Sequence, residues 1–170
     1  MIRAGAVDVD YPGSGGGRAA LVVGDLPGFT VAAEHVAWLG TVEEYQPGSF
    51  YKRELPAIRA VLDGVEPVEL LIVDGYVDLD PDGRPGLGAH VAAALGIPVI
   101  GVAKTAFRAA VHAVPVLRGA ASKPLYVTAT GLSRDDAAAY VRGMRGAYRM
   151  PDALRQVDAL ARGRARPRVA

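Results

Sequence analysis

Two aspartates stand at the ends of apolar runs that are typical of β-strands, and they are the first sign of chemistry in the sequence. Asp8 lies near the end of AGAVDV, and Asp74 ends LLIVD just before a glycine. A carboxylate is costly to desolvate, so it is usually kept near water or a partner. If the two strands lie side by side and parallel, both carboxylates reach the edge of the sheet where ligands bind. Each aspartate alone fits a turn equally well.

Three further residues could join these aspartates. Glu54 lies in a helix predicted over 50–63, Asp158 lies in the last predicted helix, and Lys104 follows the apolar run VIGVA. Carboxylates gathered with few basic neighbours repel, which raises their pKa values unless a cation balances the charge. Two Mg²⁺ or Mn²⁺ ions about 3.5 to 4 Å apart would do so and would assist an in-line displacement at a phosphodiester. Lys104 could then neutralise a phosphate in the transition state.

Each of these residues also has a plain structural interpretation. Glu54 and Asp158 could be solvated helix residues, and Lys104 could be a solubilising charge at a strand end. His90, in the apolar helix LGAHVAAALG, fits a core histidine better than a metal ligand. The chain has no cysteine, which excludes disulfides, thiolate catalysis and Cys-based zinc sites. Any metal is therefore expected to be a hard cation held by oxygen.

The composition fits one cytoplasmic domain. The 170 residues are 51% apolar, which suits a single sizeable core. No apolar run approaches the roughly 20 residues that span a bilayer, and the charged N-terminal stretch is unlike a signal peptide. We predict one domain over 1–163, a basic tail over 164–170, no membrane partner and a monomer. The net charge of +1 does not indicate a polyanion partner, and the tail arginines could contact phosphates or stay solvated.

The order of the predicted elements indicates an α/β fold. Three strands joined by Gly- and Pro-rich connections suggest an antiparallel meander. A helix follows, and then strand, helix and strand with continuous apolar runs, as in parallel strands covered on both faces. A later strand precedes two helices, the first of which begins SRDD with acidic residues suited to a helix start. The predicted ranges are strands at 2–9, 18–25, 29–39, 68–75, 97–104 and 124–131, and helices at 50–63, 87–96, 133–146 and from 151.

Several local strings, in order and at similar spacing, resemble the endonuclease V family. They are YQPGSFYKRELP at 45–56, VDG at 73–75, LGAHVAAALGIPVIGVAK at 87–104, and PLYVTATG at 124–131 followed by YRMPDALRQVD at 148–158. The resemblance covers most of the chain. It implies a ribonuclease H-like mixed sheet and a Mg²⁺-dependent endonuclease, with Mn²⁺ able to substitute. It further implies cleavage of the second phosphodiester 3′ of a deaminated base, chiefly inosine in DNA or RNA.

The same resemblance assigns roles by position. Asp8 and Asp74 would bind metal, Glu54 and Asp158 would complete the acidic site, and Lys104 would contact the scissile phosphate. Tyr45 and Pro47 would belong to the wedge that enters a duplex. The backbone around three glycines would line the pocket of the flipped base, because a glycine lets backbone approach a base edge closely. These glycines are Gly48, Gly75 and Gly101.

The departures from the family concern the substrate. The wedge usually reads Pro-Tyr-Ile-Pro and here reads Glu-Tyr-Gln-Pro, while the family's DGxG is DGYV at 74–77. The His-Pro pair that follows in the family is Asp80-Pro81, and the sequence begins at the first strand without the usual helical extension. We therefore expect a compact, divergent member that cuts inosine-containing single strands better than duplexes. A nuclease with another DNA or RNA substrate, and a non-catalytic nucleic-acid binder, remain as alternatives.

Overall fold

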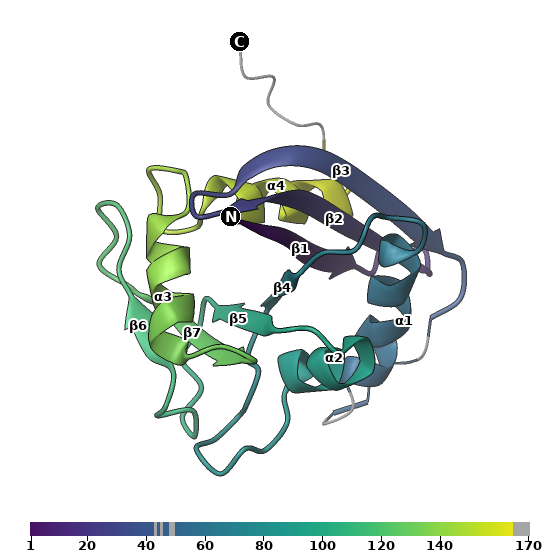
Figure 1. The fold of residues 1–170 in the computed structure, drawn as a ribbon. Helices are drawn as coiled ribbons and strands as arrows, with labels where there is room; N and C mark the ends of the chain where they lie inside the picture. The colour runs from purple at the N-terminus through teal and green to yellow at the C-terminus, as the bar shows by residue number, and fades with distance from the viewer. Residues whose placement is uncertain (43, 45, 48–49, 165–170) are drawn as a thin grey trace.

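The computed structural model describes residues 1–42, 44, 46–47 and 50–164. Tyr45 and Gly48 therefore lie outside the described residues, as do the tail arginines beyond Arg164. In the described part the chain forms one seven-stranded sheet and four helices (Figure 1). The strands are β1 (Ile2–Asp10), β2 (Gly17–Leu26), β3 (Thr30–Leu39), β4 (Leu70–Asp74), β5 (Val99–Ala103), β6 (Val114–Val116) and β7 (Leu125–Thr130), and the helices are α1 (Phe50–Leu62), α2 (Leu87–Leu95), α3 (Arg134–Gly143) and α4 (Asp152–Ala161).

The sheet has the strand order β3-β2-β1-β4-β5-β7-β6. The first three strands form the predicted antiparallel meander, and β1 pairs with β4 in parallel, as does β4 with β5. The last two strands, β7 and β6, run antiparallel to their neighbours. The α/β class and the neighbouring, parallel first and fourth strands are thus confirmed. The short β6 was absent from the sequence prediction.

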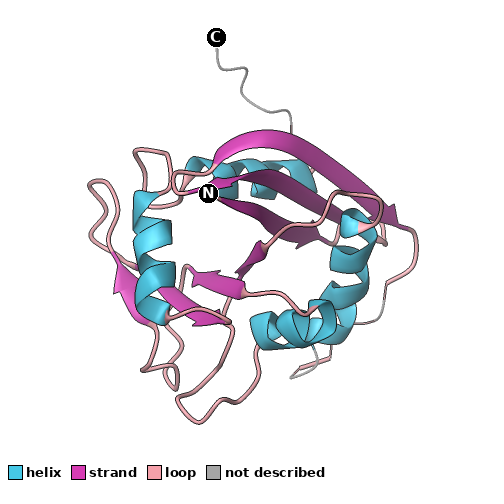
Figure 2. Cartoon of the chain, in the orientation of Figure 1, coloured by secondary structure: helices cyan, strands magenta, loops and turns pink. Residues whose placement is uncertain are grey.

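Helices cover both faces of the sheet (Figure 2). One core joins the sheet to α3 and α4, and the other joins it to α1 and α2. The strand β4 contributes to both, because Ile72 faces the first core while Leu71 and Val73 face the second. This explains the continuous apolar run in β4, since alternate side chains of a strand point to opposite faces.

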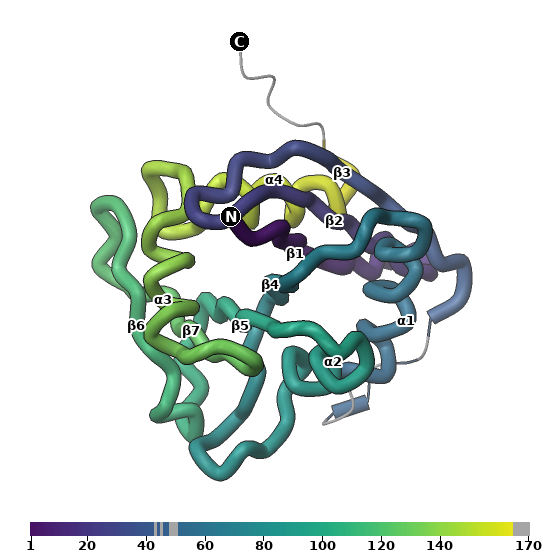
Figure 3. Tube along the Cα trace, viewed as in Figure 1, coloured from purple at the N-terminus to yellow at the C-terminus, as the bar shows by residue number. Residues whose placement is uncertain are grey.

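A buried arginine fixes the loop that leads into α4, whose course Figure 3 traces. Arg118 is only 6% exposed, and its guanidinium donates to the carbonyls of Tyr148 at 3.0 Å and Gly146 at 3.1 Å, and also to that of Met144. A buried guanidinium is tolerable when its donors are used in this way. The start of α4 is thereby held in place.

Within the described residues, no helix is long and apolar enough to cross a membrane.

Candidate active site

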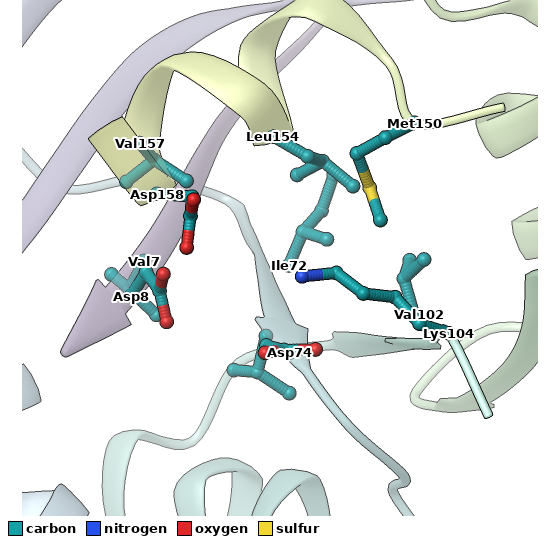
Figure 4. A pocket seen from close by; sticks show the side chains of 11 residues that line it. Val7, Asp8, Ile72, Asp74, Val102, Lys104, Met150, Leu154, Val157 and Asp158 are labelled. Atoms are coloured by element: carbon teal, nitrogen blue, oxygen red, sulfur yellow. The ribbon is translucent and has the colours of Figure 1, made fainter. Parts of the chain in front are cut away.

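The sheet register brings Asp8 and Asp74 together. The parallel ladder pairs Ala4 with Leu70 and Ala6 with Ile72. Continuing this register by two residues places Asp8 beside Asp74, with both side chains at the carboxyl ends of their strands. In Figure 4 their carboxylates face a common space. The strand-end prediction therefore accounts for this pair better than two independent turns do.

Asp158 and Lys104 approach the same space from other elements. The helix α4 packs against β1 and β2 and presents Asp158 toward Asp8, while Lys104 extends from the end of β5 toward the carboxylates (Figure 4). Together with Asp8 and Asp74 they line one small pocket. Asp158 also accepts a hydrogen bond from Arg162 at 3.1 Å, one helical turn further along. The structure thus gathers four of the five predicted catalytic residues around one pocket.

Glu54 reaches Asp8 and Asp74 from the opposite face of the sheet. It is 5% exposed in α1, so the solvated-helix interpretation was wrong for this residue. With Asp8 and Asp74 it lines a second pocket of about 90 Å³ on the α1 and α2 side. The packing of α1 against the second core turns Glu54 inward, whereas its neighbour Lys52 is exposed.

The carboxyl groups of Asp8, Glu54 and Asp74 have raised pKa values, mainly because they are partly removed from water. Burial, the charge of Asp74 and the neighbouring Asp158 carboxyl raise the pKa of Asp8 to about 8. Burial raises the pKa of Glu54 to about 7, although Tyr11 and Arg53 act in the opposite direction. Burial also raises the pKa of Asp74, against the positive charge of Lys104. Desolvation and repulsion between neighbouring carboxylates thus both disfavour the charged forms of Asp8, Glu54 and Asp74.

This donor set fits a hard divalent cation. Its ligands are carboxylate oxygens, and a bound cation would supply the positive charge that the raised pKa values call for. Among the described residues, no three His, Cys, Asp or Glu side chains form a ready-made cage for an ion. Mg²⁺ does not need one, since it is usually held by one or two carboxylates and retains several waters. Asp8 and Asp74 would provide those carboxylates.

Tyr11 and Arg53 are site neighbours that sequence reasoning missed. The Arg53 guanidinium carbon lies 3.4 Å from the centroid of the Tyr11 ring. Burial and the charge of Glu54 raise the pKa of the Tyr11 hydroxyl, so this group stays protonated beside the carboxylate. The only sequence signal was their proximity to predicted residues, since Arg53 precedes Glu54 and Tyr11 follows β1. His90 is half-buried and stacks on Tyr51 with ring centroids 3.5 Å apart.

Two side chains hold the segment that carries Lys104. The Arg149 guanidinium donates to the Lys104 carbonyl and, at 2.8 Å, to that of Pro124. The Tyr76 hydroxyl donates to the Thr105 carbonyl at 2.7 Å and accepts from the Phe107 N–H at 3.0 Å. Tyr76 therefore links the loop after Asp74 to the loop after Lys104. Its ring also lies near that of Phe107, with centroids 6.0 Å apart.

The two predicted pocket glycines within the described residues differ in their surroundings. Gly75 has a φ of +110°, which favours glycine, and open space where a side chain would begin. At Gly101 an added Cβ would lie 2.6 Å from the Gly75 carbonyl oxygen and 2.9 Å from the Val77 nitrogen. Close packing of residues 75–77 is therefore one reason for Gly101. Gly75 remains the one with room for a ligand.

Sheets of this strand order, with carboxylates at the ends of the first and fourth strands, are those of ribonuclease H-like nucleases, and this chain falls in that class. Comparison with known proteins narrows the class. The family described as Endonuclease V matches residues 2–126. Endonuclease V of Streptomyces avermitilis is 34% identical over 166 residues, which cover 85% of this chain and 72% of that protein. The Alkalilimnicola ehrlichii protein is 30% identical over 171 residues, covering 88% and 75%. The chain belongs to the endonuclease V family.

Solved structures agree with this placement. The crystal structure of the Streptomyces avermitilis endonuclease V has a TM-score of 0.80 at 33% identity, covering 95% of this chain and 80% of that one. Ciona intestinalis endonuclease V, solved with a 23mer DNA containing an inosine, has a TM-score of 0.81. At 18% identity, covering 95% and 84% of the two chains, the latter comparison shows the fold alone. The ribonuclease H-like prediction is confirmed.

Proposed function

We propose that this protein is a Mg²⁺-dependent endonuclease that hydrolyses a phosphodiester 3′ of inosine in DNA or RNA. The observation that carries the proposal is the pair Asp8 and Asp74, which lie side by side at the edge of the sheet with raised pKa values in a chain of the endonuclease V family. A pure nucleic-acid binder gains nothing from such a pair, because clustered carboxylates repel phosphates. The proposal assigns the pair to cation binding.

Lys104, Glu54 and Asp158 would each have a separate role around the scissile phosphate. Lys104 would bring its ammonium against the phosphate oxygens, where it neutralises developing charge. Glu54 and Asp158 would hold water molecules from opposite faces of the sheet through their carboxylates. When bound at Asp8 and Asp74, Mg²⁺ supplies Lewis-acid stabilisation and a more acidic water.

A second candidate substrate is favoured by Tyr76 and Val77. Val77 is fully buried, and its N–H donates to the Thr128 hydroxyl at 2.8 Å. Its side chain and its N–H are therefore both used in packing within the protein. The family's second glycine is thus replaced by a core side chain. A pocket with less free backbone could accept a base other than hypoxanthine, which would make the protein a metal-dependent nuclease for another modified or unpaired base.

The test is cleavage of matched strands that carry either inosine or its unmodified counterpart at one position. DNA and RNA strands, single and paired, are compared in Mg²⁺, Mn²⁺ and EDTA. The proposal expects a single cut 3′ of inosine, no cut in EDTA, and a faster single-turnover rate on single strands than on duplexes. Equal cleavage of the inosine and unmodified strands would favour the second candidate. No cleavage of any strand in either metal would refute the proposed cleavage at inosine.

A further inference from the structure

A groove of about 880 Å³ leads away from the acidic pocket along α4. It continues from that pocket, because the two share Lys104, Met150, Leu154 and Asp158. Figure 4 shows these four residues around the carboxylates, with Met150 and Leu154 on the side away from Asp8. From there the groove passes the loop before α4 and reaches the turn between β2 and β3 at Phe29.

The groove concentrates positive charge in a chain that is nearly neutral. The whole sequence has nineteen basic and eighteen acidic residues. The groove is lined by five basic residues against Asp152 and Asp158, and Asp158 is paired with Arg162. Such a local excess attracts a polyanion. The basic residues are Lys104, Arg145, Arg149, Arg155 and Arg164.

These cations differ in their availability. The Arg149 guanidinium is used by the carbonyls of Lys104 and Pro124. Arg145 and Arg155 are exposed, and within the described residues neither forms an ion pair. Arg155 lies 4.7 Å from the centroid of the Tyr148 ring, which is itself 63% exposed. In the described part of the chain, the groove therefore offers two guanidinium groups outside any ion pair beside an exposed aromatic ring, the combination that binds single nucleic-acid strands.

We propose that this groove binds the nucleic-acid strand on the 3′ side of the cut bond. Arg145 and Arg155 hold its phosphates, and one unpaired base stacks on Tyr148. The inference rests on the proposed function, because that function fixes where the cut lies relative to the recognised base.

The polarity follows from the two faces of the sheet. Val77, two residues after Gly75, lies on the side of α2, since it packs in the core that contains Val91 of that helix. The groove lies on the side of α4. The acidic residues stand between them. A strand whose base is held near Gly75 and whose 3′ phosphodiester lies at the carboxylates must continue onto the α4 side.

The experiment measures binding in EDTA, by fluorescence anisotropy, of inosine-containing single strands. One series shortens the 3′ flank beyond the expected cut from about eight nucleotides to one, and the other shortens the 5′ flank. The double variant Arg145→Ala/Arg155→Ala is compared with the control Arg59→Ala/Arg142→Ala, which removes the same charge from exposed arginines on α1 and α3. Tyr148→Ala and Tyr148→Phe test the stacking.

The groove variant should bind the strand with the long 3′ flank roughly tenfold more weakly than the unaltered protein does. The slope of log K against log salt concentration should also be smaller by about 1.4, since each of two lost phosphate contacts to a single strand contributes about 0.7. Tyr148→Ala should lose roughly tenfold with an unchanged slope, and Tyr148→Phe should bind normally. These losses should vanish on the short 3′ flank. Losses that follow the 5′ flank, or that the control shares, would overturn the proposal. Absence of inosine-dependent cleavage by the unaltered protein would instead refute the proposed function.

Discussion

Replacing Asp8 by asparagine should stabilise the metal-free protein at alkaline pH while it abolishes cleavage. Burial and neighbouring carboxyls raise the pKa of Asp8 from 3.8 to about 8. Between these values the folded protein keeps a proton that the unfolded chain has lost, so stability falls as pH rises through this window. At about 1.36 kcal/mol per unit the upper limit is about 5 to 6 kcal/mol. Since relaxation and water reduce it, we expect roughly 2 to 3 kcal/mol, or about 5 to 10 °C.

The assay is thermal unfolding in EDTA from pH 4 to pH 9. The unfolding temperature of Asp8→Asn should match that of the unaltered protein near pH 4 and exceed it increasingly up to pH 8. Asp63→Asn, at an exposed position after α1, controls for the loss of one negative charge. Addition of Mg²⁺ should stabilise the unaltered protein and not Asp8→Asn. A difference between the two proteins that does not change with pH would refute the reasoning about the raised pKa of Asp8.

Three further outcomes follow from the contacts around Lys104 and α4. Lys104→Met should slow single-turnover cleavage by roughly 100-fold while Mg²⁺ still raises the unfolding temperature, because its partner is phosphate; a lost Mg²⁺ effect would contradict this role. Tyr76→Phe keeps the ring but removes both hydrogen bonds to the 105–107 segment, so kcat should fall about fivefold with little change in KM, unlike the control Tyr140→Phe. Arg118→Met should lower the free energy of unfolding by roughly 2 to 4 kcal/mol in urea, because buried carbonyls lose their donor, and Arg142→Met should not.

The order of the elements and the pairing of Asp8 with Asp74 could be predicted because both follow from local patterns. Continuous apolar strands predicted a parallel segment buried on both faces, and the carboxyl ends of parallel strands share an edge. The short β6 could not be predicted, since Val114–Val116 is three residues long and contains a proline, which weakens any strand signal. Its existence depends on pairing with β7.

The surroundings of the site depend on tertiary contacts that leave no local signal. Glu54 has an ordinary position for a solvated helix residue, and only the packing of α1 against the second core buries it. Arg118 and Arg149 look like any surface arginine in the sequence, because their carbonyl partners come from distant loops. The roles of Asp8, Glu54, Asp74, Lys104 and Asp158 themselves remain predictions that mutation must test.

The way in which Lys104 is held has a consequence for the site. Its positive charge opposes the rise in the pKa of Asp74, a carboxylate that a cation would need. A lysine fixed through its ammonium would compete permanently with that cation. Here the fold holds the main chain instead, through Arg149 on the Lys104 carbonyl and Tyr76 on the next residues. The side chain is thus outside any ion pair among the described residues, which suits the predicted role of the ammonium in meeting a phosphate.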